Sequence, residues 1–276
     1  MEGKKFATSR GIVIYVRDML DRYQPDALRY FISAAGPETS DADFTWEEFL
    51  RRTNNELVAG WGNLVNRTAT MIHKRFGEVP EPGELHQVDQ VLLDDLQAGF
   101  TEVGDLIRSH HQKAAIAAVM RLVAEVNRYI TDTEPFKMKN EEDSAPGGRL
   151  RTVLWVLAQA VSDLNLMLAP FLPHGANAVD LVMGGEGKIA PMPRLEWVEE
   201  EILPGTIGAQ EGTGEVAGVD NPAGAGSVVT KKYPVITGDY KDVPRWERHD
   251  VVPGTPVGKP TPVFQKLDPS IVEEEL

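Results

Sequence analysis

Residues 46–76 read WEEFLRRTNNELVAGWGNLVNRTATMIHKRF and carry the clearest helical period in the chain. The start of this segment is marked by Thr45, with Glu48 three residues later, which is the pattern of a capping box. Gly77 and Pro80 follow its end. Apolar or small residues recur at helical steps and therefore share one face: Leu50, Leu57, Trp61, Leu64, Val65, Thr68, Ile72 and Phe76. We predict one long amphipathic helix over 46–76.

Three further segments repeat this period, at 85–108, 112–131 and 149–169. A last short helix is expected around 174–183, after two prolines that break the pattern. Four long amphipathic helices joined by short connections are most simply an antiparallel bundle. The predicted fold class is therefore mainly α, with the bundle as one domain over 46–183.

The regions on either side of this bundle differ from it in composition. Residues 1–45 are predicted to hold a loop, a short strand at 11–15 and a helix that starts at Pro25. Residues 184–232 are expected to be a flexible linker or insertion, because 203–230 are rich in small and polar residues with few apolar anchors. Residues 233–276 are predicted to form an irregular tail that packs back onto the globular part.

Composition restricts the classes of function. The 276 residues contain no cysteine, which excludes disulfides and thiolate metal sites and fits a cytoplasmic protein. No apolar run is long enough to cross a bilayer, so no membrane partner is expected. The net charge of −14 argues against sequence-blind binding to long nucleic acid, DNA included. Basic residues still cluster at 4–10, 51–52, 67–75 and 137–151, so a small folded RNA held by a few contacts is compatible with the charge pattern.

The first eleven residues, MEGKKFATSRG, form the first candidate site. A cationic loop of this kind can close over phosphates, because nucleotidyl transfer needs positive charge where negative charge builds up. Lys5, with Ser9 and the loop backbone, could supply it. Taken alone, the loop could equally be a flexible basic terminus.

The helix predicted over 46–76 carries the second candidate site. Asn63 and Arg67 are four residues apart and therefore lie on one face. Asn and Arg side chains form directional hydrogen bonds to base edges, which is how single-stranded RNA loops are read. The alternative is that both residues only form the polar face of an amphipathic helix.

The third candidate follows the helix predicted over 112–131, where Pro135 precedes Phe136. An aromatic ring beside a rigid proline can stack on a splayed base, which is worth about 1–3 kcal/mol. Alternatively, Phe136 caps the bundle as a core residue. The six histidines lack a frame of carboxylates or cysteines, so we predict that none of them binds a metal.

Two short runs near the N-terminus resemble class I aminoacyl-tRNA synthetases, and more narrowly the C-terminal portion of the methionyl-tRNA synthetase family in its actinobacterial form. Residues 5–9, KFATS, are similar to the family's Lys-Met-Ser-Lys-Ser loop, with Thr8 in place of the second lysine. Residues 26–31, DALRYF, are similar to the segment that follows this loop in the family.

The anticodon-reading residues of the same family also have matches. Asn63 and Arg67 match an Asn and an Arg that read the anticodon, while Ala59 stands where some relatives have a further Asn. Phe136, after Pro135, stands where the family has a tryptophan. The resemblance therefore implies an anticodon-binding bundle, preceded by a remnant of an α/β catalytic domain.

The resemblance implies a methionine–tRNA ligase, which charges tRNA(Met) with L-methionine through methionyl-adenylate, using ATP with Mg²⁺. In that reading Lys5 and Ser9 are catalytic, and the ATP phosphates are held by Lys5, Thr8, Ser9 and Arg10. The CAU anticodon stem-loop is recognised by Asn63, Arg67, Pro135 and Phe136.

The family's HIGH motif and methionine pocket are not found in these 276 residues. We therefore expect the chain alone to be inactive and to bind no cofactor, with ATP and L-methionine as partners only alongside a catalytic half. The alternative function is a stand-alone helical RNA-binding or scaffold module without catalysis.

Overall fold

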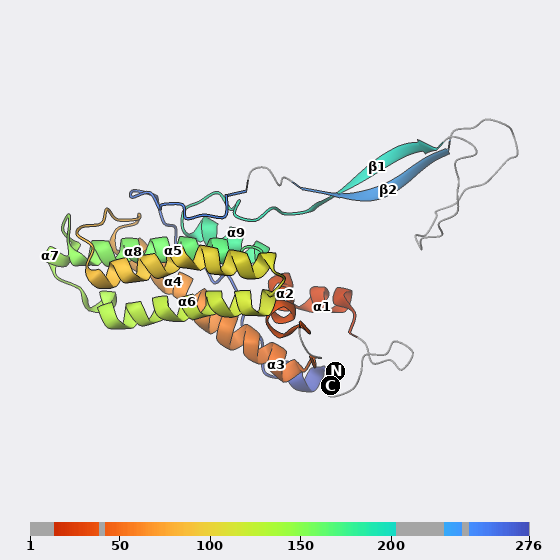
Figure 1. Ribbon diagram of the computed structural model, residues 1–276, viewed down its shortest axis with the longest axis horizontal. Helices are drawn as coiled ribbons and strands as arrows, with labels where there is room; N and C mark the ends of the chain where they lie inside the picture. Colours follow the sequence, from red (N-terminus) through yellow and green to blue (C-terminus); the bar gives the residue numbers. More distant parts are fainter. Residues whose placement is uncertain (1–13, 39–41, 203–228, 239–242, 276) are drawn as a thin grey trace, which may run out of the picture. The chain divides into compact units, whose positions relative to one another are not determined.

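The computed structural model describes residues 14–38, 42–202, 229–238 and 243–275 (Figure 1). The chain divides into two compact units, Met1–Pro191 with Asp242–Leu276, and Met192–Lys241. The first unit holds the helices α1 (Val16–Arg22), α2 (Pro25–Ala35), α3 (Trp46–Arg51), η2 (Arg52–Gly62), α4 (Asn63–Arg75), α5 (Gln87–Arg108), α6 (Gln112–Thr133), η3 (Pro135–Lys137), α7 (Glu141–Ser144), α8 (Arg149–Leu168), α9 (Pro173–Val182) and α10 (Ile271–Glu274). The second unit holds the strands β1 (Arg194–Ile202) and β2 (Val229–Thr237).

The described part of the protein is mainly helical, as the apolar periods predict. α5, α6, α8 and α9 begin and end within a few residues of the predicted bounds, and α2 starts at Pro25. The strand predicted at 11–15 falls largely outside the described residues, and its last residue, Tyr15, is the N-cap of α1 instead. Within the described ranges, no helix combines the length and apolar character needed to span a bilayer.

Thr45 starts the long helical segment as the sequence predicts. Its hydroxyl accepts a hydrogen bond from the backbone N–H of Glu48 at 3.2 Å. The reciprocal half of the predicted capping box is absent from the hydrogen bonds of these residues. The carboxylate of Glu48 instead contacts Arg51, with Nε 2.6 Å from Oε2, and Arg52, with Nε 2.8 Å from Oε1.

Thr45→Ala should lower the free energy of unfolding by about 1 kcal/mol, because one N–H of the first turn of α3 loses its acceptor. Thr45→Ser keeps the hydroxyl and should retain most of this stability. Urea unfolding of the three proteins measures the difference. Equal stability of the alanine and serine variants would contradict a capping role for the hydroxyl.

The structure corrects the prediction of one uninterrupted α-helix over 46–76. Between α3 and α4, residues 52–62 form a π-helix in which Leu57 and Trp61 are fully buried. Apolar residues four apart reach one side of either helix type, so their spacing does not distinguish the two. Asn54 in this π-helix is held by a remote partner, because its Nδ2 donates to the Leu267 carbonyl at 2.9 Å and its Oδ1 accepts from the Leu267 N–H at 2.8 Å.

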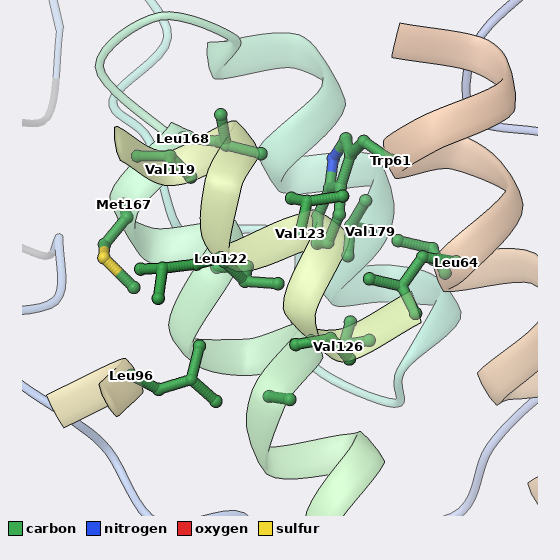
Figure 2. Close-up of a cluster of buried hydrophobic side chains, with 14 of the residues drawn as sticks. Trp61, Leu64, Leu96, Val119, Leu122, Val123, Val126, Met167, Leu168 and Val179 are labelled. Atoms are coloured by element: carbon green, nitrogen blue, oxygen red, sulfur yellow. The ribbon is translucent and has the colours of Figure 1, made fainter. Parts of the chain in front are cut away.

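The main hydrophobic core lies where the long helices pack together. Figure 2 shows part of it, and each long helix contributes a side chain there that is at most 1% exposed: Trp61 from η2, Leu64 from α4, Leu96 from α5, Leu122 from α6 and Met167 from α8. Burying such side chains is the dominant favourable term in folding. The same contacts set which side of α4 is left for solvent.

A second, aromatic cluster joins α1, α2, α3 and α10. Phe44 packs edge-on against Trp46, with ring centroids 5.0 Å apart, and Phe31 packs edge-on against Phe44 at the same distance. Ile271 of α10 is buried in this cluster. Edge-to-face aromatic pairs add about 0.5–1.5 kcal/mol each beyond the area that they bury. The segment before α4 is therefore firmly packed.

Residues 243–275 lie against the helices of the first unit. Trp246 donates its indole N–H to the carbonyl of Phe100 at 2.8 Å and packs edge-on against that ring. Arg248 binds the buried carboxylate of Asp163, with Nη2 2.6 Å from Oδ2. These contacts connect segments that are far apart in the chain.

The second unit is an antiparallel hairpin, in which Leu195 pairs with Ile236 and Trp197 with Pro234. The prediction of a flexible linker over 184–232 is therefore wrong for residues 194–202, which form β1. The predicted start of the tail at residue 233 lies within β2. The central part of that linker, 203–228, lies outside the described residues. Each strand here depends on its pairing partner, which the glutamate-rich local sequence of β1 does not reveal.

Candidate functional site

The residues predicted to bind phosphates all lie outside the described part of the chain: Lys5, Thr8, Ser9 and Arg10. The predicted site residues that the structure does describe lie on α4 and in the turn that follows α6.

α4 presents Asn63 and Arg67 on one side. Leu64 and Thr68, their neighbours in the sequence, are fully buried and fix the rotation of the helix. Asn63 is exposed and Arg67 is partly exposed. Within the described residues, Arg67 makes no hydrogen bond or ion pair, so its guanidinium donors are not used by the rest of the described structure.

The turn after α6 holds Phe136 outside the core. Glu134 adopts a left-handed conformation, with φ of 48°, which ends α6 and reverses the chain. Pro135 is buried, whereas 48% of Phe136 is exposed. The Lys137 N–H donates to the Glu134 carbonyl at 2.8 Å, which closes the short helix η3. A large ring is thus presented to solvent from a closed turn.

One hydrogen bond connects this turn to the helix of Asn63 and Arg67. Arg75 is the last residue of α4, and its Nη2 donates to the backbone carbonyl of Met138 at 2.9 Å. Met138 follows η3 directly and packs against the main core. The structure thereby brings the predicted residues of α4 and of the Phe136 turn onto two segments in direct contact.

A buried carboxylate anchors the other side of the turn. Asp89, in the first turn of α5, is fully buried and accepts from the Tyr129 hydroxyl at 2.6 Å and from the His86 N–H at 2.8 Å. Arg149, at the start of α8, forms a two-pronged ion pair with it, with Nη2 2.8 Å from Oδ1. Tyr129 lies in the last turns of α6, so this network joins three helix ends beside the Phe136 turn.

Electrostatics at Asp89 favour the charged form. Burial alone raises the pKa of Asp89, but the hydrogen bonds from Arg149, Tyr129 and the His86 N–H outweigh burial and leave the pKa below its usual value. Burial of the Tyr129 hydroxyl and its hydrogen bond to the Asp89 carboxylate both raise the pKa of Tyr129. Its hydroxyl therefore keeps its proton and donates it to the hydrogen bond.

We did not predict these supporting residues from the sequence. Asp89 had a local signal, because it lies three residues after His86 and accepts its N–H, as an acidic residue in a helix's first turn often does. Arg149 and Arg75 had none, because their partners are 60 and 63 residues away.

A cavity of about 590 Å³ lies between α8, α9 and part of the 243–275 segment. Two of its three aspartates already have partners: Asp163 binds Arg248, and Asp180 accepts from the Gly187 N–H at 2.8 Å. In the part of the chain that the structure describes, no group of three or more His, Cys, Asp and Glu side chains could hold a metal ion.

Comparison with known proteins identifies relatives of this chain. The family model described as tRNA synthetases class I (M) matches residues 1–69. A methionine–tRNA ligase from a Nocardioides species is 58% identical over 276 residues, covering 100% of this chain and 41% of the relative. The whole chain is homologous to part of the methionyl-tRNA synthetases. The methionine–tRNA ligase of Beutenbergia cavernae is 54% identical and is covered to 40%.

The resemblance seen in the sequence is thereby confirmed, and the chain spans about two fifths of the length of these synthetases. A solved structure of the Mycobacterium tuberculosis methionyl-tRNA synthetase in complex with methionyl-adenylate is 26% identical, with a TM-score of 0.62 over 67% of this chain and 36% of that one. The apo form of the M. tuberculosis synthetase has a TM-score of 0.65 over 93% of this chain and 41% of that one, at 21% identity, and supports the fold.

Proposed function

We propose that this chain reads the CAU anticodon of tRNA(Met) as part of a methionine–tRNA ligase. In this proposal α4, α5, α6 and α8 act as the antiparallel anticodon-binding bundle. The observation that carries it is the exposed side of α4, where Arg67 has no partner among the described residues and Asn63 lies one turn away. The homology to methionyl-tRNA synthetases indicates that the RNA is tRNA(Met).

The chemistry of these side chains suits a single-stranded loop. Asn63 and Arg67 can donate to the edge of one unstacked base, and the exposed ring of Phe136 can stack on another. A rise of 1.5 Å per residue places Arg67 about 12 Å along the axis from Arg75, which contacts the Phe136 turn. A few successive nucleotides can bridge that span.

The overall charge makes such contacts selective. With a net charge of −14, the protein repels most polyanions, so RNA binding must come from a few directed contacts. A ring smaller than the tryptophan of the family should stack less strongly, which leaves more of the discrimination to Arg67 and Asn63.

The wider reaction is part of the same proposal. The loop residues Lys5, Thr8, Ser9 and Arg10 would bind the phosphates of ATP, and Mg²⁺ would enter with the nucleotide. Lys5 and Ser9 would stabilise the charge that develops as methionyl-adenylate forms from ATP and L-methionine. This reaction would take place in the cytoplasm, where tRNA is charged.

Binding of RNA hairpins tests the proposal. The 276-residue chain is titrated against a fluorescent anticodon stem-loop carrying CAU and against one that carries UAU. We expect CAU to bind at least about fivefold more tightly, the effect of losing one good base contact. Equal binding of both hairpins, or binding of neither, would overturn anticodon reading by this chain.

A further inference from the structure

We propose that Arg75 is a positioning residue, which holds the Phe136 turn in place against the helix that carries Asn63 and Arg67. This inference rests on the proposed function, because it assigns a role in presenting Phe136 to the anticodon. The observation behind it is the bond from Arg75 Nη2 to the Met138 carbonyl, at 2.9 Å.

The Phe136 ring does little to fix its own position. Nearly half of it is exposed, so packing alone does not hold it. The turn depends on its backbone, in which Glu134 has a positive φ that costs a non-glycine residue about 1–2 kcal/mol. A strained turn persists only where both of its ends are held.

The entry to the turn is held by the buried network. Tyr129, five residues before Glu134, donates to Asp89, whose charge is neutralised by Arg149. The final turn of α6 is therefore attached to α5 and α8, independently of α4.

The exit from the turn is held by the bond from Arg75 to the Met138 carbonyl, together with the packing of the Met138 side chain against the main core. A guanidinium donating to a carbonyl makes a charge-assisted bond, which is stronger than a neutral one. Because Arg75 ends α4, the same helix carries the base-reading pair and fixes the exit of the aromatic turn. The spacing between Phe136 and Arg67 is thereby set by one rigid element.

Arg75 is exposed, so its loss should leave global stability nearly unchanged while loosening the turn. Lys74 provides a matched control, because it is exposed, carries the same charge and makes no hydrogen bond or ion pair among the described residues.

The first experiment needs no RNA. Amide hydrogen exchange is measured for Lys137 and Met138, whose N–H groups donate to the Glu134 and Pro135 carbonyls at 2.8 and 3.3 Å. We expect exchange to be about three- to tenfold faster in Arg75→Ala, unchanged in Lys74→Ala and partly restored in Arg75→Lys. Unchanged exchange in Arg75→Ala would overturn the positioning role, whether or not the chain binds RNA.

The second experiment uses the ratio of CAU to UAU hairpin affinity. Arg75→Ala should reduce this ratio about threefold or more in the wild-type background and have no further effect in a Phe136→Ala background. Lys74→Ala should leave the ratio unchanged, even if it weakens both hairpins equally. An equal effect of Arg75→Ala in both backgrounds would show that Arg75 does not act through Phe136. Absence of any CAU preference in the wild-type chain would instead overturn the proposed function.

Discussion

Asp89→Ala should lower the free energy of unfolding by about 3–5 kcal/mol, the largest loss of stability that we predict for a single substitution. The carboxylate is fully buried and bound by Arg149, Tyr129 and the His86 N–H. Its removal leaves a largely buried guanidinium without a counter-charge and a buried hydroxyl without an acceptor. A buried unpaired charge costs far more than the net value of the pair.

Chemical unfolding of matched variants checks this prediction. Asp95→Ala removes an exposed aspartate from the same helix and should change stability by no more than about 0.5 kcal/mol. The double variant Asp89→Leu with Arg149→Met removes both charges together and should recover part of the loss. A loss below about 1 kcal/mol for Asp89→Ala would mean that the network is not a significant source of stability.

The pH dependence of this stability follows from the lowered pKa of Asp89. Burial opposes ionisation, but the hydrogen bonds from three partners more than offset it and leave the pKa of the folded state below the usual value near 4. The contribution is therefore complete above about pH 4 and is lost as the pH falls through the folded-state pKa. The stability gap between the wild-type chain and Asp89→Asn should shrink over that acidic range, and a gap independent of pH would contradict this assignment.

The features that could be predicted from the sequence are those set by neighbouring residues. The start of α3 at Thr45, the start of α2 at Pro25 and the apolar faces of the long helices all depend on spacings of a few residues. The helix that carries Asn63 and Arg67 was predictable for the same reason, because a period of 3.6 residues decides which side faces the core.

The features that could not be predicted depend on remote partners. The π-helical segment around Asn54 binds Leu267, and β1 requires β2 as its pairing strand. The bond from Arg75 to Met138 likewise joins segments that no local pattern connects. For the candidate site, the exposed side of α4 with Asn63 and Arg67 could therefore be predicted from the sequence, whereas the contacts that support the Phe136 turn required the fold.

Arg67→Ala should abolish most of the preference for CAU, with a loss of about 1–3 kcal/mol of discrimination, or roughly 5- to 150-fold. The reason is that Arg67 is partly exposed on α4 and unpaired within the described residues, so its N–H groups can form hydrogen bonds with the RNA. Affinity for the UAU hairpin should change much less. The measurement is the same hairpin titration, made for both anticodons.

Two variants separate base reading from simple charge. Asn66→Ala alters an exposed residue of the same helix that lies about 100° around the axis from Arg67, and it should leave the preference intact. Arg67→Lys keeps the positive charge but loses the planar fork of donors, so it should retain the salt dependence of binding and lose most of the preference. If Arg67→Lys kept the full preference, Arg67 would act on a phosphate through its charge, and the discrimination between bases would have to come from Asn63 and Phe136.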